Sequence, residues 1–236
     1  MKIKEHLLHE DENLVAINKP SGMLTIPDRK GNISLKNYLQ KAYPEIFTVH
    51  RLDKDTSGVV VFAKNEAAHK ELSQLFEGRE VEKKYLGLVL GNFAIDKDTI
   101  EEGIMEHPVI KGKMVVNKKG KPSVTDYEVI EKFRFFSWVS FQILTGRTHQ
   151  IRVHMKHAGH PIVCDETYGD GKPVLLSTLK KKFNLSKDEE EERPILRRLA
   201  LHSSSLKFKL AGLDYDLEAP LPKDLKACLQ QLRKVG

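Results

Sequence analysis

Apolar residues along the chain fall mainly into short strand patterns. A continuous run of β-branched and aromatic residues at positions 59–63 predicts a buried strand. Further strands are predicted at residues 14–18, 81–90, 124–130, 135–144 and 206–217. Apolar residues at helical spacing predict helices with the N-caps Ser34, Asn65, Thr148 and Asp224. Because strands outnumber helices and do not alternate with them regularly, the pattern favours a mixed α+β fold over a doubly wound parallel sheet.

The expected helix ends come from breaker residues and from helical periodicity. Gly78 is expected to end the helix that follows Asn65, and Pro44 to end the helix that follows Ser34. In the helix after Thr148, the side opposite its apolar residues carries Arg152 and His149. Without further information, Arg152 would be interpreted as an exposed helix charge.

One segment, residues 180–193, has a strongly biased composition. It starts with Lys180-Lys181-Lys182 and continues with an acidic run at residues 188–192. Blocks of like charge repel each other and lie in solvent. Since strand and helix patterns resume after Pro194, we interpret the segment as an exposed insertion within a single domain of residues 1–236.

Composition excludes several classes of protein and favours a soluble one. The chain has 236 residues, of which 40% are hydrophobic and 31% charged, and its apolar runs are far shorter than the roughly 20 residues of a membrane-spanning helix. The N-terminus has no apolar signal core, and the two cysteines form no CxxC pair. We therefore expect a cytoplasmic protein with no membrane partner.

The net charge of +6 is modest for this length, so its distribution is more informative than its size. A run of lysines without acidic neighbours lies between His107 and Thr125: Lys111, Lys113, Lys118, Lys119 and Lys121. On its own, this run is typical of a solvated hairpin tip.

The polar stretch at residues 50–58, directly before the buried strand at 59–63, holds the densest set of reactive side chains. Such a loop can direct polar groups into a cleft. It can also be a simple turn in which Asp53 or Asp55 accepts backbone hydrogen bonds. A third interpretation, the Asp-x-Asp-x-Thr signature of aspartyl phosphatases, fits poorly because that motif should follow an apolar strand.

Histidines at residues 154–160 raise the alternative of a zinc site in a hydrolase. His154 and His157 share the spacing of ligands on one helix face, and His160 and Cys164 follow. The breakers Gly159 and Pro161 would end the helix before His160 could join the others. We expect no metal site.

Four separated stretches resemble, in order, the motifs of the RluA family of RNA pseudouridine synthases. His50-Arg51-Leu52-Asp53 with Thr56-Ser57-Gly58 resembles the central motif. The other stretches are residues 18–22, Lys84-Tyr85, and residues 146–154 with 159–161, and the segments 197–202 and 219–222 resemble the C-terminal landmarks. The resemblance covers residues 14 to about 222, and several motifs in register are more specific than one.

The resemblance implies a pseudouridine synthase fold, with a mixed, largely antiparallel sheet flanked by helices and a central active-site cleft. It also implies an isomerase that acts on uridine in structured ribosomal or transfer RNA, by base flipping and without a cofactor. Asp53 takes the position of the catalytic aspartate, Tyr85 that of a ring packed against the target base, and Arg152 that of an arginine that orients the aspartate. Arg51 resembles the arginine that enters the space left by the flipped base.

The implied substrate contacts extend beyond these groups. Arg147 is expected at an RNA phosphate, and further binding candidates are His50, Thr56, Lys84 and His149. His50 is also interpreted as a structural hydrogen-bonding residue rather than a proton shuttle. Cys164 departs from the family, which usually has glycine before the aspartate that is Asp165 here.

Motif residues begin near position 18, so the resemblance predicts no N-terminal S4-type domain. RNA selection would then depend on Lys111 to Lys121 and Lys180 to Lys182. We expect a monomer without an obligate protein partner. The alternative to an enzyme is a basic RNA-binding or assembly protein that keeps this fold without catalysis.

Overall fold

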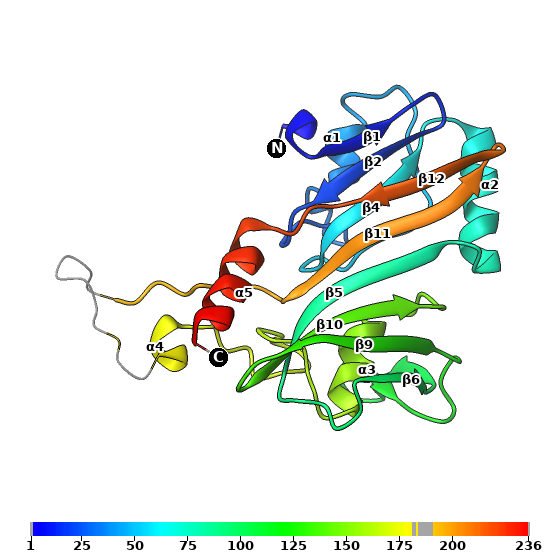
Figure 1. Cartoon of the computed structure of the whole chain (residues 1–236). Coiled ribbons are helices and arrows are strands. Elements are labelled where there is room, and N and C mark those ends of the chain that lie inside the picture. The colour runs from blue at the N-terminus through cyan, green and yellow to red at the C-terminus, as the bar shows by residue number, and fades with distance from the viewer. Residues whose placement is uncertain (1, 181–182, 184–190, 236) are drawn as a thin grey trace. The chain divides into compact units, whose positions relative to one another are not determined.

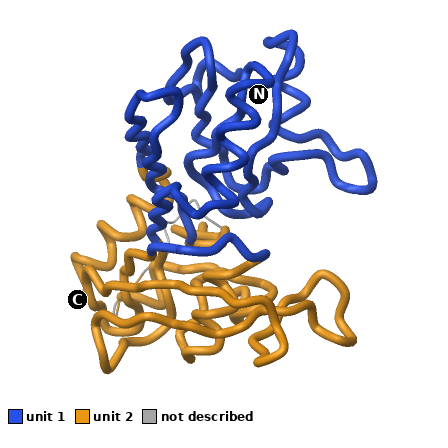
Figure 2. Tube along the Cα trace, turned by 90° about the vertical axis from the view of Figure 1, so that its right-hand side faces the viewer, with its two compact units in different colours: residues 1–86, 142–148, 201–220 blue, residues 87–141, 149–200, 221–236 orange. Residues whose placement is uncertain are grey.

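The computed structural model describes residues 2–180, 183 and 191–235, in two compact units. Unit 1 comprises Met1–Leu86, Gln142–Thr148 and Leu201–Pro220, and unit 2 comprises Gly87–Phe141, His149–Ala200 and Leu221–Gly236 (Figure 2). The chain therefore passes from one unit to the other several times. That residues 1–236 form a single domain remains a prediction. The expected insertion at residues 180–193, with Lys181 and Lys182, lies mostly outside the described residues.

Unit 1 is built on a mixed, largely antiparallel sheet, as the sequence predicts. Its strands are β1 (Leu7–Glu10), β2 (Leu14–Lys19), β3 (Phe47–Thr48), β4 (Ser57–Ala63), β11 (Leu201–Leu210) and β12 (Leu213–Glu218). The order is β1-β2-β4-β11, and off this path β12 pairs with β11 and β3 with β4 (Figure 1). Only the β4–β11 pairing among these is parallel. All seven residues of β4 are buried, which explains its continuous apolar sequence.

Two α-helices and a short 3-10 helix, Ile3–Glu5, belong to unit 1. In α1 (Leu35–Leu39), Ser34 forms the predicted N-cap together with Asn37, but the helix ends well before Pro44. In α2 (Glu66–Gly78), the Asn65 side chain accepts a hydrogen bond from the Ala68 N–H at 2.8 Å.

The core of unit 1 forms where α2 packs on the sheet. Ala68 and Leu72 of α2 are buried in one cluster with Val59 and Val61 of β4 and with Leu206 of β11. Helix α2 ends at Gly78, as the sequence predicts, and the left-handed residue that follows it is Arg79 (φ 64°). The left-handed turn of the backbone comes one residue after Gly78, because Gly78 is still part of the helix.

Among its described residues, unit 2 contains strands β6 to β9 and three helices. Strand β6 (Lys97–Glu101) pairs with β9 (Val124–Lys132), and β7 (Ile104–Glu106) forms a hairpin with β8 (Met114–Val116). The helices are α3 (Gln150–His157), α4 (Leu176–Leu179) and α5 (Lys223–Val235). Strands β5 (Glu82–Leu90) and β10 (Phe136–Ile143) contain residues of both units.

Two helix starts in unit 2 differ from the prediction. His149, in the left-handed conformation (φ 56°), precedes α3 in place of a Thr148 cap. Asp224 lies inside the first turn of α5, where its carboxylate pairs with Arg198 (Oδ2–Nε 2.8 Å). Among the described residues, no helix has the length and apolar character needed to cross a membrane.

Candidate active site

The polar loop before β4 is held in place by a buried lysine at the end of β2. Lys19 is fully buried, and its Nζ donates hydrogen bonds to the carbonyls of Lys54 (2.9 Å), Met23 (2.8 Å) and Pro20 (3.1 Å). Burying an ammonium is costly unless its donors are satisfied. Residues 18–22 were assigned from resemblance alone, and through Lys19 they hold the loop backbone in place as a clamp of hydrogen bonds.

A threonine completes this clamp near Asp53. The Thr25 hydroxyl donates to the Leu52 carbonyl (2.9 Å) and accepts from the Leu52 N–H (3.2 Å). The Asp53 carbonyl accepts a hydrogen bond from the Thr56 N–H at 3.2 Å, so its backbone forms a turn. The loop backbone on both sides of the Asp53 side chain is thus fixed by hydrogen bonds.

Gly58 is required where β4 meets β11. It has a φ of 119°, and a Cβ atom at this position would collide with the backbone of Ser203. Nearby, the buried His202 ring bonds the Ser57 hydroxyl through Nδ1 (3.0 Å) and the Ala219 carbonyl through Nε2 (3.1 Å). These contacts explain why the central motif and the C-terminal landmarks occur together.

Tyr85 lies on β5 with only 8% of its surface exposed, and it is electrostatically coupled to Asp53. Burial raises the pKa of the Tyr85 phenol, the Ser203 hydroxyl lowers it, and the charge of Asp53 raises it further. The resulting pKa is well above its usual range. Tyr85 therefore remains a neutral phenol, suited to packing and hydrogen bonding and not to acting as a base.

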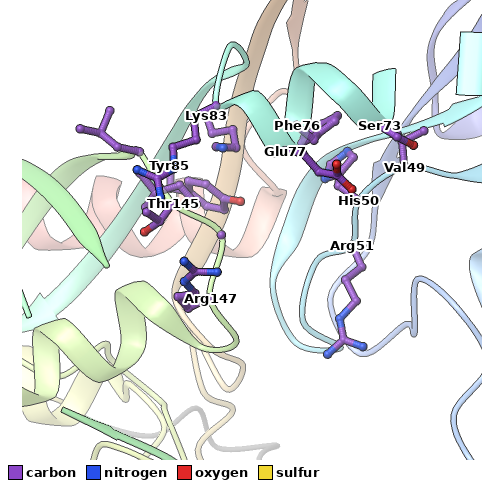
Figure 3. Close-up of a pocket in the computed structure, with 14 residues that line it drawn as sticks. Val49, His50, Arg51, Ser73, Phe76, Glu77, Lys83, Tyr85, Thr145 and Arg147 are labelled. Atoms are coloured by element: carbon purple, nitrogen blue, oxygen red, sulfur yellow. The ribbon is translucent and has the colours of Figure 1, made fainter. Parts of the chain in front are cut away.

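A cavity of about 580 Å³ opens beside Tyr85, entirely within unit 1. Figure 3 shows Tyr85, Lys83, Arg51 and Arg147 around it, together with Thr145. This volume lies in the range of sites that enclose a small organic ligand. Asp53 itself does not line the cavity, whereas Arg51, two residues earlier in the same loop, does.

The charge around the cavity is predominantly positive. Arg51, Arg79, Lys83 and Arg147 line it, and Glu77 is the acidic residue among the lining side chains. A concave surface with clustered cations attracts anionic ligands such as nucleic acid. The sequence predicts Arg51 and Arg147 here but not Arg79 or Lys83. Strand alternation could have indicated Lys83, since it shares a face of β5 with Tyr85.

His50 has a structural role at the cavity wall. Its Nε2 accepts a hydrogen bond from the Val61 N–H (3.0 Å), and its ring stacks on Phe76 with centroids 4.5 Å apart. Burial, and secondarily the charge of Lys83, lower the pKa of His50 to about 3. The ring is therefore neutral and anchored to β4, which confirms its interpretation as a structural hydrogen-bonding residue.

Arg152 lies in unit 2 and is buried, so the interpretation as an exposed helix charge is wrong. Its Nε and Nη2 donate to Oδ2 and Oδ1 of Asp165 at 2.7 and 2.9 Å, and its guanidinium lies 5.0 Å from the centroid of the Tyr168 ring. Burial disfavours the Asp165 anion, but the Arg152 hydrogen bonds and charge hold the pKa of Asp165 below its usual value. The pairing expected between Arg152 and Asp53 remains a prediction.

The other substrate-binding candidates do not gather at the cavity. The His149 Nδ1 is hydrogen-bonded to the Tyr168 hydroxyl at 2.7 Å. Thr56 is buried in the loop, and Lys84, on the face of β5 opposite Tyr85, pairs with Glu82 at 3.1 Å. Their roles in binding remain predictions.

The lysine run lies on and after the β7–β8 hairpin. Lys111 and Lys113 belong to the connection between the two strands, and Lys118, Lys119 and Lys121 follow β8. Lys111, Lys118, Lys119 and Lys121 are exposed. Their position is that of a solvated hairpin, and contact with RNA remains a prediction.

The histidines considered for a zinc site make hydrogen bonds to the protein. His154 bonds the Thr125 hydroxyl through Nδ1 (2.9 Å) and the Glu102 carbonyl through Nε2 (3.1 Å), and His160 Nδ1 bonds the Leu90 carbonyl (3.0 Å). Both ring nitrogens of His154 are thus engaged. Across the described part of the chain, no cluster of three or more His, Cys, Asp or Glu side chains is arranged to hold a metal.

Cys164 forms the turn that glycine would form more easily. Its φ is 59°, in the left-handed region, and its side chain is buried. The following Asp165 accepts hydrogen bonds from the backbone N–H groups of Thr167 and Tyr168 (2.9 and 3.0 Å). The departure from the family pattern therefore leaves the turn before Asp165 in place.

Comparison with known proteins gives consistent results. Residues 13–157 match the family described as RNA pseudouridylate synthase. Ribosomal large subunit pseudouridine synthase D of Escherichia coli K12 is 34% identical over 245 residues, with 96% of this chain and 70% of that protein covered. Ribosomal large subunit pseudouridine synthase C of Salmonella typhi is 36% identical over 234 residues, with the same coverage.

A solved structure agrees in fold as well as in sequence. The human protein RNA Pseudouridylate Synthase Domain Containing 4 superimposes with a TM-score of 0.77 at 28% identity, covering 98% of this chain and 94% of its own. The mixed, largely antiparallel α+β architecture expected from the sequence is that of these proteins.

Proposed function

Because the chain belongs to the RNA pseudouridylate synthase family and is an RNA pseudouridine synthase, we propose that it isomerises a uridine of large-subunit ribosomal RNA with Asp53 as the catalytic residue. The choice of ribosomal over transfer RNA is supported by the names of the relatives, both ribosomal large subunit enzymes. We further propose that it acts as a monomer in the cytoplasm.

The observation that carries the assignment of the site is the coupling of Asp53 to Tyr85 beside a cavity lined by cations. Isomerisation breaks the bond between N1 and C1′ and joins C5 to C1′, with no net gain or loss of atoms. A carboxylate, ionised at neutral pH, can serve in this reaction as a nucleophile or a base without a separate activator. The hydrogen-bonded backbone on either side of Asp53 would hold that carboxylate in a constant position.

Tyr85 is proposed to pack against the target base. An aromatic stack contributes about 1 to 3 kcal/mol for each base, which is comparable with the few kcal/mol needed to extrude a nucleotide from a helix. Its raised pKa keeps the phenol neutral beside the negative charge of Asp53. Arg51, exposed at the cavity, is proposed to enter the space that the extruded base leaves.

Arg152 is proposed to orient Asp53, and the proposal rests on the motif resemblance. Its guanidinium donates two hydrogen bonds to Asp165, so its orientation is constrained before any substrate arrives. Such support is the usual requirement for a residue that positions a catalytic group.

The test is release of tritium from large-subunit ribosomal RNA transcribed with uridine labelled at C5. Wild-type protein is expected to release it, and Asp53→Asn is expected to fall to background while keeping its affinity for RNA. Asp55→Asn is the matched control, because Asp55 is an exposed acid of the same loop.

Other outcomes are informative. Undiminished release by Asp53→Asn would contradict the catalytic assignment. Release from transfer RNA and none from ribosomal RNA would contradict the substrate. Tight binding of both RNAs without any release would favour the non-catalytic alternative.

A further inference from the structure

Lys83 is a buried cation near Tyr85 that the mechanism above does not use. It lies on β5, two residues before Tyr85, and is 6% exposed. Alternate residues of a strand point to the same face and are spaced by roughly 7 Å. Lys83 and Tyr85 accordingly both line the cavity of unit 1 (Figure 3).

The described residues around the Lys83 ammonium provide no anion paired with it. The centroid of the Phe76 ring lies 5.9 Å from Nζ, and among the described residues no ion pair or hydrogen bond to this ammonium is found. Glu77, the acidic residue that lines the cavity, is not paired with it. Burial, and then the charge of Arg79, lower the pKa of Lys83.

A buried ammonium without an acceptor is costly for the folded protein. An anion that binds in the cavity would offset this free-energy penalty by pairing with the ammonium. Arg79 adds to the preference of the cavity for an anion, because it lines the same cavity. It follows the end of α2, where its left-handed backbone turns the chain toward β5. An ordinary packing lysine would extend its ammonium into solvent, whereas Lys83 keeps it at the cavity wall.

We propose that Lys83, assisted by Arg79, binds a backbone phosphate of the RNA strand next to the nucleotide that packs on Tyr85. The inference rests on the proposed catalytic role of this cavity. A nucleotide whose base contacts Tyr85 has its phosphodiester groups one sugar away, which corresponds to the spacing along β5 between Tyr85 and Lys83. The contact is made only by a strand that enters the cavity, so it favours an extruded nucleotide over RNA held elsewhere on the surface.

The test compares Lys83→Met, which keeps the length of the side chain without its charge, with Lys83→Arg, which keeps the charge. The substrate is bulk RNA from cells that lack this protein, grown with uracil labelled at C5 with tritium, so that the result does not depend on which RNA is modified. Lys83→Met is expected to lower kcat/KM about tenfold or more. It is also expected to flatten the slope of log kcat/KM against log salt by about 1, as for the loss of one phosphate contact.

Three further measurements distinguish phosphate binding by Lys83 from a purely structural role in packing. Lys83→Met is expected to unfold at the same temperature as the wild type or higher, because it removes a buried unpaired charge. Inorganic phosphate is expected to inhibit the wild type more strongly than Lys83→Met. Lys207→Met, which removes an exposed lysine of the same unit paired with Asp216, is expected to change neither kcat/KM nor the salt slope.

An unchanged salt slope in Lys83→Met, or a loss of activity matched by a loss of thermal stability, would overturn the inference. So would a Lys83→Arg variant as impaired as Lys83→Met. Wild-type turnover of the bulk RNA tests the proposed function separately. RNA binding measured by fluorescence anisotropy at the same salt concentrations tests Lys83 even if turnover is absent.

Discussion

Lys19 and His50 show how single buried side chains prepare the loop that carries Asp53. Lys19 holds carbonyl groups of the loop and of its own turn with one ammonium, and His50 ties the start of the loop to the Val61 N–H. Both residues can affect the reaction by positioning the loop, without contacting RNA. Substitutions at either position are expected to act through the position of Asp53.

The protonation state of His50 makes folding stability depend on pH. The pKa of His50 is about 3 in the folded protein, below the value of about 6.5 for an unfolded chain. Between these values the unfolded state binds more protons, so the stabilisation from neutral His50 is complete above pH ~6.5 and is lost as the pH falls.

Compared with His50→Gln, the wild type is expected to lose up to about 1.4 kcal/mol for each pH unit between about pH 6 and pH 4. Urea unfolding at a series of pH values measures this difference. Carboxylates that titrate in the same range are common to both proteins, so the difference isolates His50. If the free energy of unfolding depends on pH in the same way in both proteins, the assignment of a depressed pKa to His50 is contradicted.

Helix ends and turns depend on left-handed residues that are not glycine. Arg79 ends α2, His149 precedes α3, Cys164 forms the turn before Asp165, and Ala211 lies between β11 and β12. Sequence patterns place such turns at glycine, since glycine adopts positive φ at little cost. In this chain residues other than glycine adopt it, and the start of α3 was predicted wrongly because His149, not Thr148, precedes the helix in the left-handed conformation.

The turn between β11 and β12 can be stabilised by one substitution. Ala211 and Gly212 form a two-residue connection, both with positive φ (49° and 79°), between the paired residues Leu210 and Leu213. Asn followed by Gly is the preferred pair for such a turn. Ala211→Asn is therefore expected to raise the free energy of unfolding by about 1 kcal/mol.

Thermal or chemical unfolding of Ala211→Asn measures this gain. Ala211→Val, which places a β-branched side chain in the left-handed region, is the control and is expected to be destabilised. Equal stability of all three proteins would show that Ala211 is not strained.

For the whole molecule, charge distribution is more informative than net charge. The chain carries a net charge of only +6, yet cations gather at the cavity of unit 1 and along the β7–β8 hairpin of unit 2. Electrostatic contacts to phosphates supply much of the affinity of proteins for RNA and make it dependent on salt. The hairpin lysines are therefore expected to contribute to RNA affinity and not to the chemical step.

Replacing Lys111, Lys118 and Lys119 together by Gln is expected to weaken RNA binding at low salt. The slope of log affinity against log salt should fall by up to about 3, with kcat unchanged. The control replaces three other exposed lysines, Lys207, Lys209 and Lys226, and so removes the same charge. If both triple variants bind alike, the hairpin has no specific role.

The sequence by itself determined the fold class, most strands and the family. Apolar runs such as residues 59–63 report burial directly, and local rules predicted the caps Ser34 and Asn65. Asp53 and Tyr85 were assigned through resemblance between motifs, since their residue types alone also fit a turn or a core position.

Tertiary structure decided which charges have partners. Arg152 is buried and paired with Asp165, and the Lys19 ammonium binds loop carbonyls. Lys83 lies at the cavity, and no acid in the described part of the chain pairs with it. Periodicity and capping depend on interactions over a few residues, so they can be inferred from sequence. Burial and pairing of a charge depend on groups that only the folded chain brings together, and these set the electrostatics of the site.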